Sequence, residues 1–164
     1  MVVNMAATEP LQLDVATLSA LAGDAAARFV LERLREAGHA GVRSSHGYLF
    51  QRLLTGDATI GELAADLGIT QQGASKHVAD LERLALAIRV TDPRDQRVRR
   101  VRLTASARQA IETARAARAE LEASLVDRFG AEDLTATRRV LAGLIDETGE
   151  TALVRGRAMP LPPA

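Results

Sequence analysis

The densest group of side chains suited to chemistry in this sequence is a short arginine-rich stretch. Residues 88–104 contain six arginines and two aspartates, a local net charge of +4: Arg89, Arg94, Arg97, Arg99, Arg100, Arg102, Asp92 and Asp95. Because the whole chain has a formal net charge of zero, the remaining residues must sum to −4. A basic segment on an otherwise acidic chain is typical of a surface that binds nucleic acid.

A second group of polar side chains lies on a predicted helix over residues 70–84. Ala74, Val78 and Leu81 follow helical spacing, so we expect them to face inward. The start and the opposite side of that helix carry hydrogen-bonding side chains: Thr70, Gln71, Gln72, Ser75, Lys76 and His77. In a major groove Gln can pair with adenine and Lys with guanine, and a helix N-terminus suits a phosphate.

The sequence offers no comparable arrangement for catalysis. The three histidines, His39, His46 and His77, are scattered and form no HxxH or HxxxH pair, and there is no cysteine. We find no nucleophile elbow, phosphate loop or paired carboxylates. The chain is therefore not expected to be an enzyme, and we expect no cofactor and no metal.

Two short helices joined by a tight turn must position the polar face of residues 70–84. Thr59 and Glu62 match a capping box that begins the first helix, and Gly68 suits the left-handed position that ends it. Thr70 is a plausible cap for the second helix. This pattern fits a helix-turn-helix, but equally a two-helix corner in any helical protein.

The segment that follows favours the helix-turn-helix. Residues 87–90 and 98–103 are rich in β-branched side chains, and the Asp-Pro stretch between them has turn chemistry, so we predict a hairpin. An arginine-rich hairpin directly after a helix-turn-helix describes a wing. Outside this unit, apolar spacing predicts helices over residues 11–38, 42–54, 105–129 and 131–148.

At this point the sequence resembles the MarR family of bacterial transcriptional regulators. Residues 92–104 contain D-P-x-D-x-R followed by V-x-L-T, which is similar to the wing signature of that family. Residues 63–70 and 81–84 are similar to its helix-turn-helix. Two positions depart from the pattern, because Ala85 and Ala107 stand where the family tends to have glycine. Since a left-handed turn at Ala85 would be strained, we expect the preceding helix to continue slightly further.

The resemblance implies roles for the wing. Arg97 falls at the position of the family's wing arginine and is expected to enter a narrow minor groove, where the negative potential is enhanced. Asp95 is expected to brace Arg97 or the hairpin. The other basic side chains are candidates for phosphate contacts or ordinary solvated charges: Arg94, Arg99, Arg100 and Arg102.

Many members of the family respond to small phenolic or aromatic ligands bound between the dimerisation helices and the DNA-binding lobe. The resemblance makes Phe29, Arg33, His46 and Phe50 candidates for such a pocket, although Phe at helical spacing is commonly core. It also implies a homodimer and a repressor that binds an inverted-repeat operator. A thiol-based peroxide sensor is excluded, since the chain has no cysteine.

The expected fold is mainly α with a small β-hairpin, a winged helix-turn-helix with N- and C-terminal dimerisation helices. We predict these segments: a flexible start 1–10, a dimerisation helix 11–40, a DNA-binding domain 41–104, dimerisation helices 105–148 and a tail 149–164. The sequence has no long apolar run and no signal-peptide pattern, so we expect a cytoplasmic protein without a membrane span. The competing function is an architectural DNA-binding or protein-interaction module without ligand response.

Overall fold

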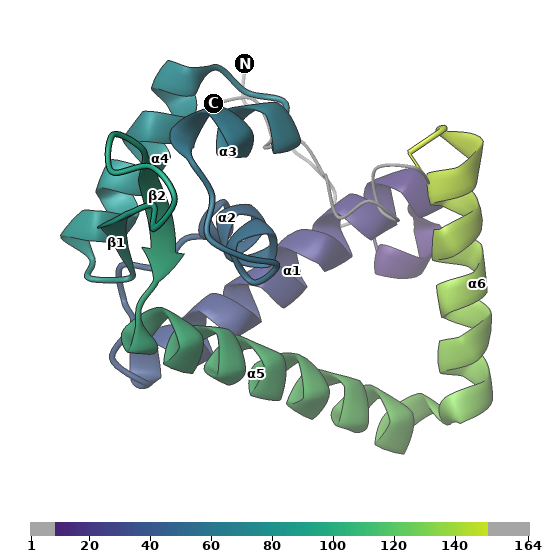
Figure 1. Ribbon diagram of the computed structural model, residues 1–164. Coiled ribbons are helices and arrows are strands. Elements are labelled where there is room, and N and C mark those ends of the chain that lie inside the picture. The colour runs from purple at the N-terminus through teal and green to yellow at the C-terminus, as the bar shows by residue number, and fades with distance from the viewer. Residues whose placement is uncertain (1–8, 151–164) are drawn as a thin grey trace, which may run out of the picture.

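The computed structural model describes residues 9–150. Most of the flexible start predicted for residues 1–10 and most of the tail predicted for residues 149–164 therefore lie outside the described residues. Within the range the predicted class is confirmed: helices dominate, and the only strands form one antiparallel hairpin (Figure 1). A 3-10 turn at Pro10–Gln12 precedes the main elements, which are α1 Val15–Glu36, α2 His46–Leu53, α3 Ile60–Asp66, α4 Gln71–Arg83, β1 Ala87–Thr91, β2 Arg99–Leu103, α5 Ala105–Phe129 and α6 Ala131–Glu147.

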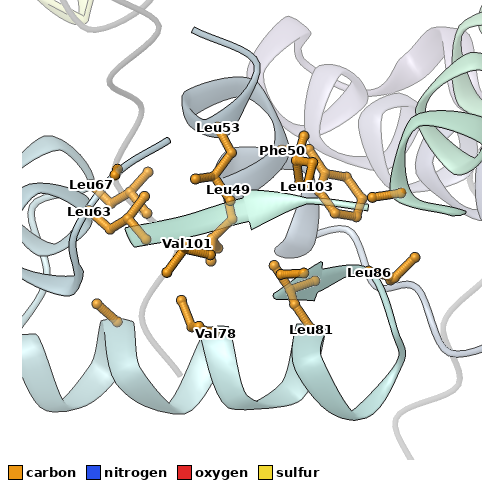
Figure 2. Close-up of a cluster of buried hydrophobic side chains, with 14 of the residues drawn as sticks. Leu49, Phe50, Leu53, Leu63, Leu67, Val78, Leu81, Leu86, Val101 and Leu103 are labelled. Carbon is orange, nitrogen blue, oxygen red and sulfur yellow. The ribbon is translucent and has the colours of Figure 1, made fainter. Parts of the chain in front are cut away.

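One hydrophobic core holds α2, α3, α4, the hairpin and the first turns of α5 together. Leu49, Leu63, Leu81 and Val101 are among its fully buried side chains. Figure 2 shows Val78 and Leu81 pointing from α4 toward Val101 on the hairpin, with Leu49 on the other side of the strand. This core fixes α4 and the hairpin relative to each other, as a winged helix-turn-helix requires.

The hairpin pairs Ala87 with Leu103 at its base and Thr91 with Arg99 near its tip. The segment before α3 is tied to it as well, because Ala58 and Val101 exchange backbone hydrogen bonds of 3.3 and 2.7 Å. The middle of β2 is thus tied to the segment before α3, and the base of the hairpin is connected to α4 and α5.

Side-chain caps set the starts of four helices. The predicted caps of Thr59 and Thr70 are present, and Thr59 and Glu62 form the full capping box. Thr104 accepts a hydrogen bond from the amide of Ala107 and begins α5. The first helix starts later than the predicted residue 11, because Asp14 caps it at Val15. The second starts at His46 rather than at residue 42, after a run of turns.

The expected extension of α4 beyond Leu84 is wrong. Helix α4 ends at Arg83, and Ala85 adopts a left-handed φ of 56°. The amide of Leu86 donates to the carbonyl of Leu81 at 2.8 Å, and the amide of Ala85 donates to Glu82 at 2.9 Å. These are the two bonds of a Schellman motif, here with alanine where glycine is usual. Ala107, the other alanine that stands where the family tends to have glycine, is fully buried in α5.

A smaller cluster packs α1 against α5 through Val30, Leu34, Ala110 and Ala117. Figure 1 shows α5 leading away from the winged unit and α6 standing at its far end. No residue of α6 is buried. Among the described helices, none is long and apolar enough to cross a membrane.

Candidate nucleic-acid interface

The turn between α3 and α4 presents the start of α4 to solvent. Gly68 has a φ of 64°, and the amide of Ile69 donates to the carbonyl of Ala64 at 3.0 Å, which ends α3. The hydroxyl of Thr70 accepts from the amide of Gly73 at 3.1 Å and caps α4. The remaining amides of the first turn of α4 are left available for an anion such as a phosphate.

The polar face predicted for α4 is present. Ala74, Val78 and Leu81 are fully buried, as their spacing indicated. The side chains predicted as contacts are all accessible: Thr70, Gln71, Gln72 and Lys76 are exposed, and Ser75 and His77 are half-buried. A helix of 13 residues is about 20 Å long, which is enough to lie in a major groove.

Two aspartates shape the tip of the wing through its backbone. Asp92 accepts from the amide of Arg94 at 2.8 Å, and Asp95 accepts from the amide of Arg97 at 2.9 Å. These are turns in which an aspartate mimics a backbone acceptor two residues before the donor. Asp95 therefore braces the hairpin, one of the two roles expected for it.

The arginines of the wing fall into two groups. Within the described residues, the guanidinium groups of Arg94 and Arg97 have no hydrogen-bonding or ion-pair partner, and both side chains are exposed. The arginines of the strands are held by neighbours. Arg102 pairs with Asp57 at 2.6 Å, and Arg89 pairs with Glu82 at 3.1 Å. Arg99 donates to the hydroxyl of Thr91 and has no ion pair among the described residues.

Arg100 ties the wing to α3. Its Nε donates to Asp92, and its Nη1 donates to Glu62 at 2.9 Å and to the carbonyl of Asp57 at 3.3 Å. The hydrogen bond from Arg100 is the main reason that the pKa of Asp92 lies below its usual value, and the amide of Arg94 lowers it further. Arg100 and Arg102 are thus part of the scaffold, and the sequence did not indicate their partners Asp57 and Glu62.

An open cavity of about 490 Å³ lies between α1, α2 and α5. Its apolar wall includes Val30, Leu34, Phe50 and Ile111, and Arg43, Arg115, Arg118 and Glu122 also line it. Of the four predicted pocket residues only Phe50 lies in this wall. Phe29, Arg33 and His46 do not line this cavity, and their role in ligand binding stays a prediction.

Other contacts occupy the three residues that miss the cavity. The guanidinium of Arg33 lies 4.9 Å from the ring centre of Phe29 and pairs with Glu120 of α5 at 2.6 Å. His46 is fully buried, and its ring Nε2 lies 3.0 Å from the carboxylate of Asp80 on α4. Long-range pairs of this kind cannot be identified from helical spacing alone.

Comparison with known proteins gives a consistent result. Residues 43–98, which include α2, α3, α4, β1 and the wing tip, match the sequence model of the MarR family. No curated protein matches this chain in sequence.

Solved structures match nearly the whole described fold. A complex of S. aureus MepR with DNA is 20% identical, covers 81% of this chain and 98% of that one, and has a TM-score of 0.64. YusO from Bacillus subtilis is 18% identical, covers 86% and 99%, and has a TM-score of 0.64. The MarR family transcription regulator SP03579 is 26% identical, covers 84% and 87%, and has a TM-score of 0.62.

The family model covers the polar face of α4 and the wing tip, and the solved structures extend the likeness to the flanking helices. The sequence likeness to the MarR family thus covers residues 43–98, and the described fold as a whole is similar to that of solved MarR-family structures.

Proposed function

We propose that this protein binds double-stranded DNA sequence-specifically as a homodimer, with α4 in the major groove and the wing tip in the adjacent minor groove. The observation that carries this proposal is the division among the arginines of the wing. Three of the strand arginines, Arg89, Arg100 and Arg102, are ion-paired with protein carboxylates, whereas Arg94 and Arg97 at the tip are exposed and unpaired within the described residues. Unpaired guanidinium groups beside a polar helix suit a groove and its phosphates.

Each contact residue has an assigned role in this proposal. Gln71, Gln72 and Lys76 read base edges, because their side chains are exposed on α4. The half-buried Ser75 and His77 and the cap Thr70 lie beside them and contact bases or phosphates. Arg97 enters the minor groove, and Arg94 and Arg99 contact phosphates, which add affinity without sequence choice.

The homodimer is proposed from apolar side chains that the single chain leaves in water. Phe129 of α5 and Val140 and Leu141 of α6 are 50%, 55% and 39% exposed. Soluble monomers rarely leave such a row of large apolar side chains uncovered. We propose that residues 11–40 and 105–148 form the dimer interface, and that residues 41–104 form the DNA-binding domain. The solved likenesses extend across both parts.

We also propose that binding represses transcription in the cytoplasm and that a small aromatic ligand releases the DNA. The cavity between α1, α2 and α5 supports the ligand part, because Phe50 contributes to an apolar wall and Arg43, Arg115 and Arg118 supply positive charge. An apolar cavity with a few charged groups is typical of small-molecule sites. Titrating benzoate into a protein–DNA complex tests this step, and DNA that stays bound at saturating benzoate speaks against an aromatic acid.

Footprinting on the DNA immediately upstream of the protein's own gene tests the proposed DNA binding. Such regulators often control themselves or a neighbour, so a discrete, symmetrical protected segment is expected. The competing function, an architectural module, would give diffuse coverage without a preferred sequence. Absence of protection at low salt would contradict DNA binding, since the electrostatic part of the affinity is then strongest.

A further inference from the structure

His46 is a fully buried histidine that neither the proposed DNA contacts nor the cavity uses. It begins α2, is fully buried, and both ring nitrogens have partners. The amide of Arg43 donates to Nδ1 at 3.2 Å, and Nε2 lies 3.0 Å from Oδ2 of Asp80 on α4. His46 therefore links the segment before α2 to the helix proposed to read DNA.

The geometry fixes the protonation state of the ring. A backbone amide can only donate, so Nδ1 must accept and cannot carry a hydrogen. The hydrogen of the neutral ring must then be on Nε2, which donates it to Asp80. If the ring gained a second proton, its Nδ1–H would face the N–H of Arg43, and one of these contacts would have to break.

We propose that His46 is a positioning residue for DNA binding: its neutral Nε2–H form holds α4, through Asp80, in the orientation that binds DNA. This proposal rests on the proposed DNA binding and deepens it. Helix α4 is also supported by its contacts with α3 and β1 and by Val78 and Leu81 in the main core. Asp80 lies one turn after Lys76 on α4, so a shift of Asp80 moves the contact face with it.

The link between His46 and Asp80 depends on pH, because it needs the neutral form of the His46 ring. Burial lowers the pKa of His46, and the charges of Arg43 and His77 lower it further, while Asp80 acts in the opposite direction. Asp80 itself is also paired with Arg83 at 2.5 Å and with Arg43 at 3.5 Å. Since the folded pKa lies below the unfolded value of about 6.5, the link is intact above pH 6.5 and weakens as the pH falls below it.

Two substitutions at position 46 separate the two hydrogen bonds. His46→Gln places an amide nitrogen near the position of Nε2 and can still donate to Asp80. His46→Asn places its amide oxygen near Nδ1 and can accept from Arg43, but it does not reach Asp80. At about pH 7.5 we expect His46→Gln to bind a footprinted DNA duplex within about twofold of wild type, and His46→Asn to bind it roughly threefold to tenfold more weakly, the size of one lost hydrogen bond.

The pH profile distinguishes positioning from general loss of stability. Between about pH 7.5 and pH 5.5, the affinity of wild type should fall relative to that of His46→Gln, which has no titrating ring at this position. All other side chains are the same in the two proteins, so the ratio of the two affinities isolates His46. Parallel profiles, or equal losses for the two variants in step with their thermal midpoints, would overturn the proposal.

A second pair of variants approaches the link from α4 and serves if the His46 variants do not fold. Asp80→Asn keeps an acceptor for Nε2–H and should retain most of the affinity, whereas Asp80→Ala should lose about as much as His46→Asn. Asp80→Ala with wild-type affinity would overturn the role of His46. Failure of the wild-type chain to bind any duplex would instead contradict the proposed DNA binding, so the two failures are distinguishable.

Discussion

Ala85 occupies a backbone conformation that favours glycine. Ala85 follows α4 and has a φ of 56°. Gly68 holds the equivalent position after α3 and has a φ of 64°. Left-handed geometry costs a residue with a Cβ about 1–2 kcal/mol. The surrounding structure keeps Ala85 there, because the hydroxyl of Thr104 donates to its carbonyl at 2.7 Å and Leu86 is buried next to it.

Replacing Ala85 by Gly should therefore stabilise the protein. The relief of backbone strain exceeds the added freedom of the unfolded chain, so we expect a gain of up to about 1 kcal/mol in the free energy of unfolding, measured by urea denaturation. Gly68→Ala is the matched control and should lose about 1 kcal/mol. A loss of stability in Ala85→Gly would show that the left-handed turn is not present in solution.

Arg97→Ala should weaken operator binding without affecting the fold. The guanidinium of Arg97 is exposed and has no partner among the described residues, so its removal should cost about 1–3 kcal/mol of binding free energy and leave the thermal midpoint unchanged. Arg139→Ala, which removes the same charge from exposed α6, is the control. Equal dissociation constants for wild type and Arg97→Ala at matched salt would remove Arg97 from the interface.

Single residues were predictable from the sequence where the determinant is local. Thr59, Thr70 and Thr104 cap helices through bonds that span three residues, and such bonds follow from spacing. The contact of His46 with Asp80 was not predicted, because the two residues are 34 positions apart in the sequence. Arg100 was treated as a possible phosphate contact for the same reason, since Glu62 lies 38 residues away.

At the scale of elements, the wing and α3 behave as one unit. Helix α3 contributes Glu62, which both closes its capping box and accepts from Arg100 of β2. The hydrogen bond from the amide of Thr59 is the main reason that the pKa of Glu62 lies below its usual value, and Arg100 lowers that pKa further. The orientation of the wing therefore depends on the start of α3.

Arg100→Ala should weaken DNA binding by a different route from Arg97→Ala. Loss of the link to Glu62 and Asp92 frees the wing, so we expect a roughly threefold to tenfold weaker affinity. Because Arg100 does not contact phosphate in this account, the dependence of affinity on salt should stay as in wild type. For a phosphate-contacting arginine the salt slope should fall by about one. A lower slope in Arg100→Ala would place this residue at the DNA instead.

The elements themselves were predicted well where the signals at their ends were strong. Helix α5 runs over residues 105–129 as expected, because Thr104 caps its start and Gly130, with a φ of 87°, follows its end. The starts of α1 and α2 were placed too early, since apolar spacing continues into the turns that precede them. The end of α4 depended on the contact of Ala85 with Thr104, which no local pattern reveals.

At the scale of the molecule, the exposed apolar face of α6 predicts a dimer that a single charge can disrupt. Leu141→Glu should shift the protein toward monomer in light scattering at micromolar concentration, because a charge in an apolar interface is costly. Arg139→Glu is the control, since it lies two residues away on the opposite side of α6. Monomeric wild-type protein at this concentration would contradict the dimer.

A two-fold dimer presents two copies of α4 to one face of the DNA. Both can enter the major groove only if the centres of the half-sites lie about 10 bp, or roughly 34 Å, apart. The two Arg97 side chains should then lie over A·T-rich flanks, where the minor groove is narrow. The operator is therefore expected to be an inverted repeat with this spacing.

Affinity measured by gel shift on spacer variants of the footprinted operator tests whether the dimer reads two half-sites with α4. Inserting about 5 bp between the half-sites rotates one of them by half a turn and should abolish tight binding. Inserting about 10 bp restores the face but stretches the dimer, and should restore binding only poorly. If the operator with about 5 bp inserted is bound as tightly as the native operator, the dimer does not read two half-sites with α4.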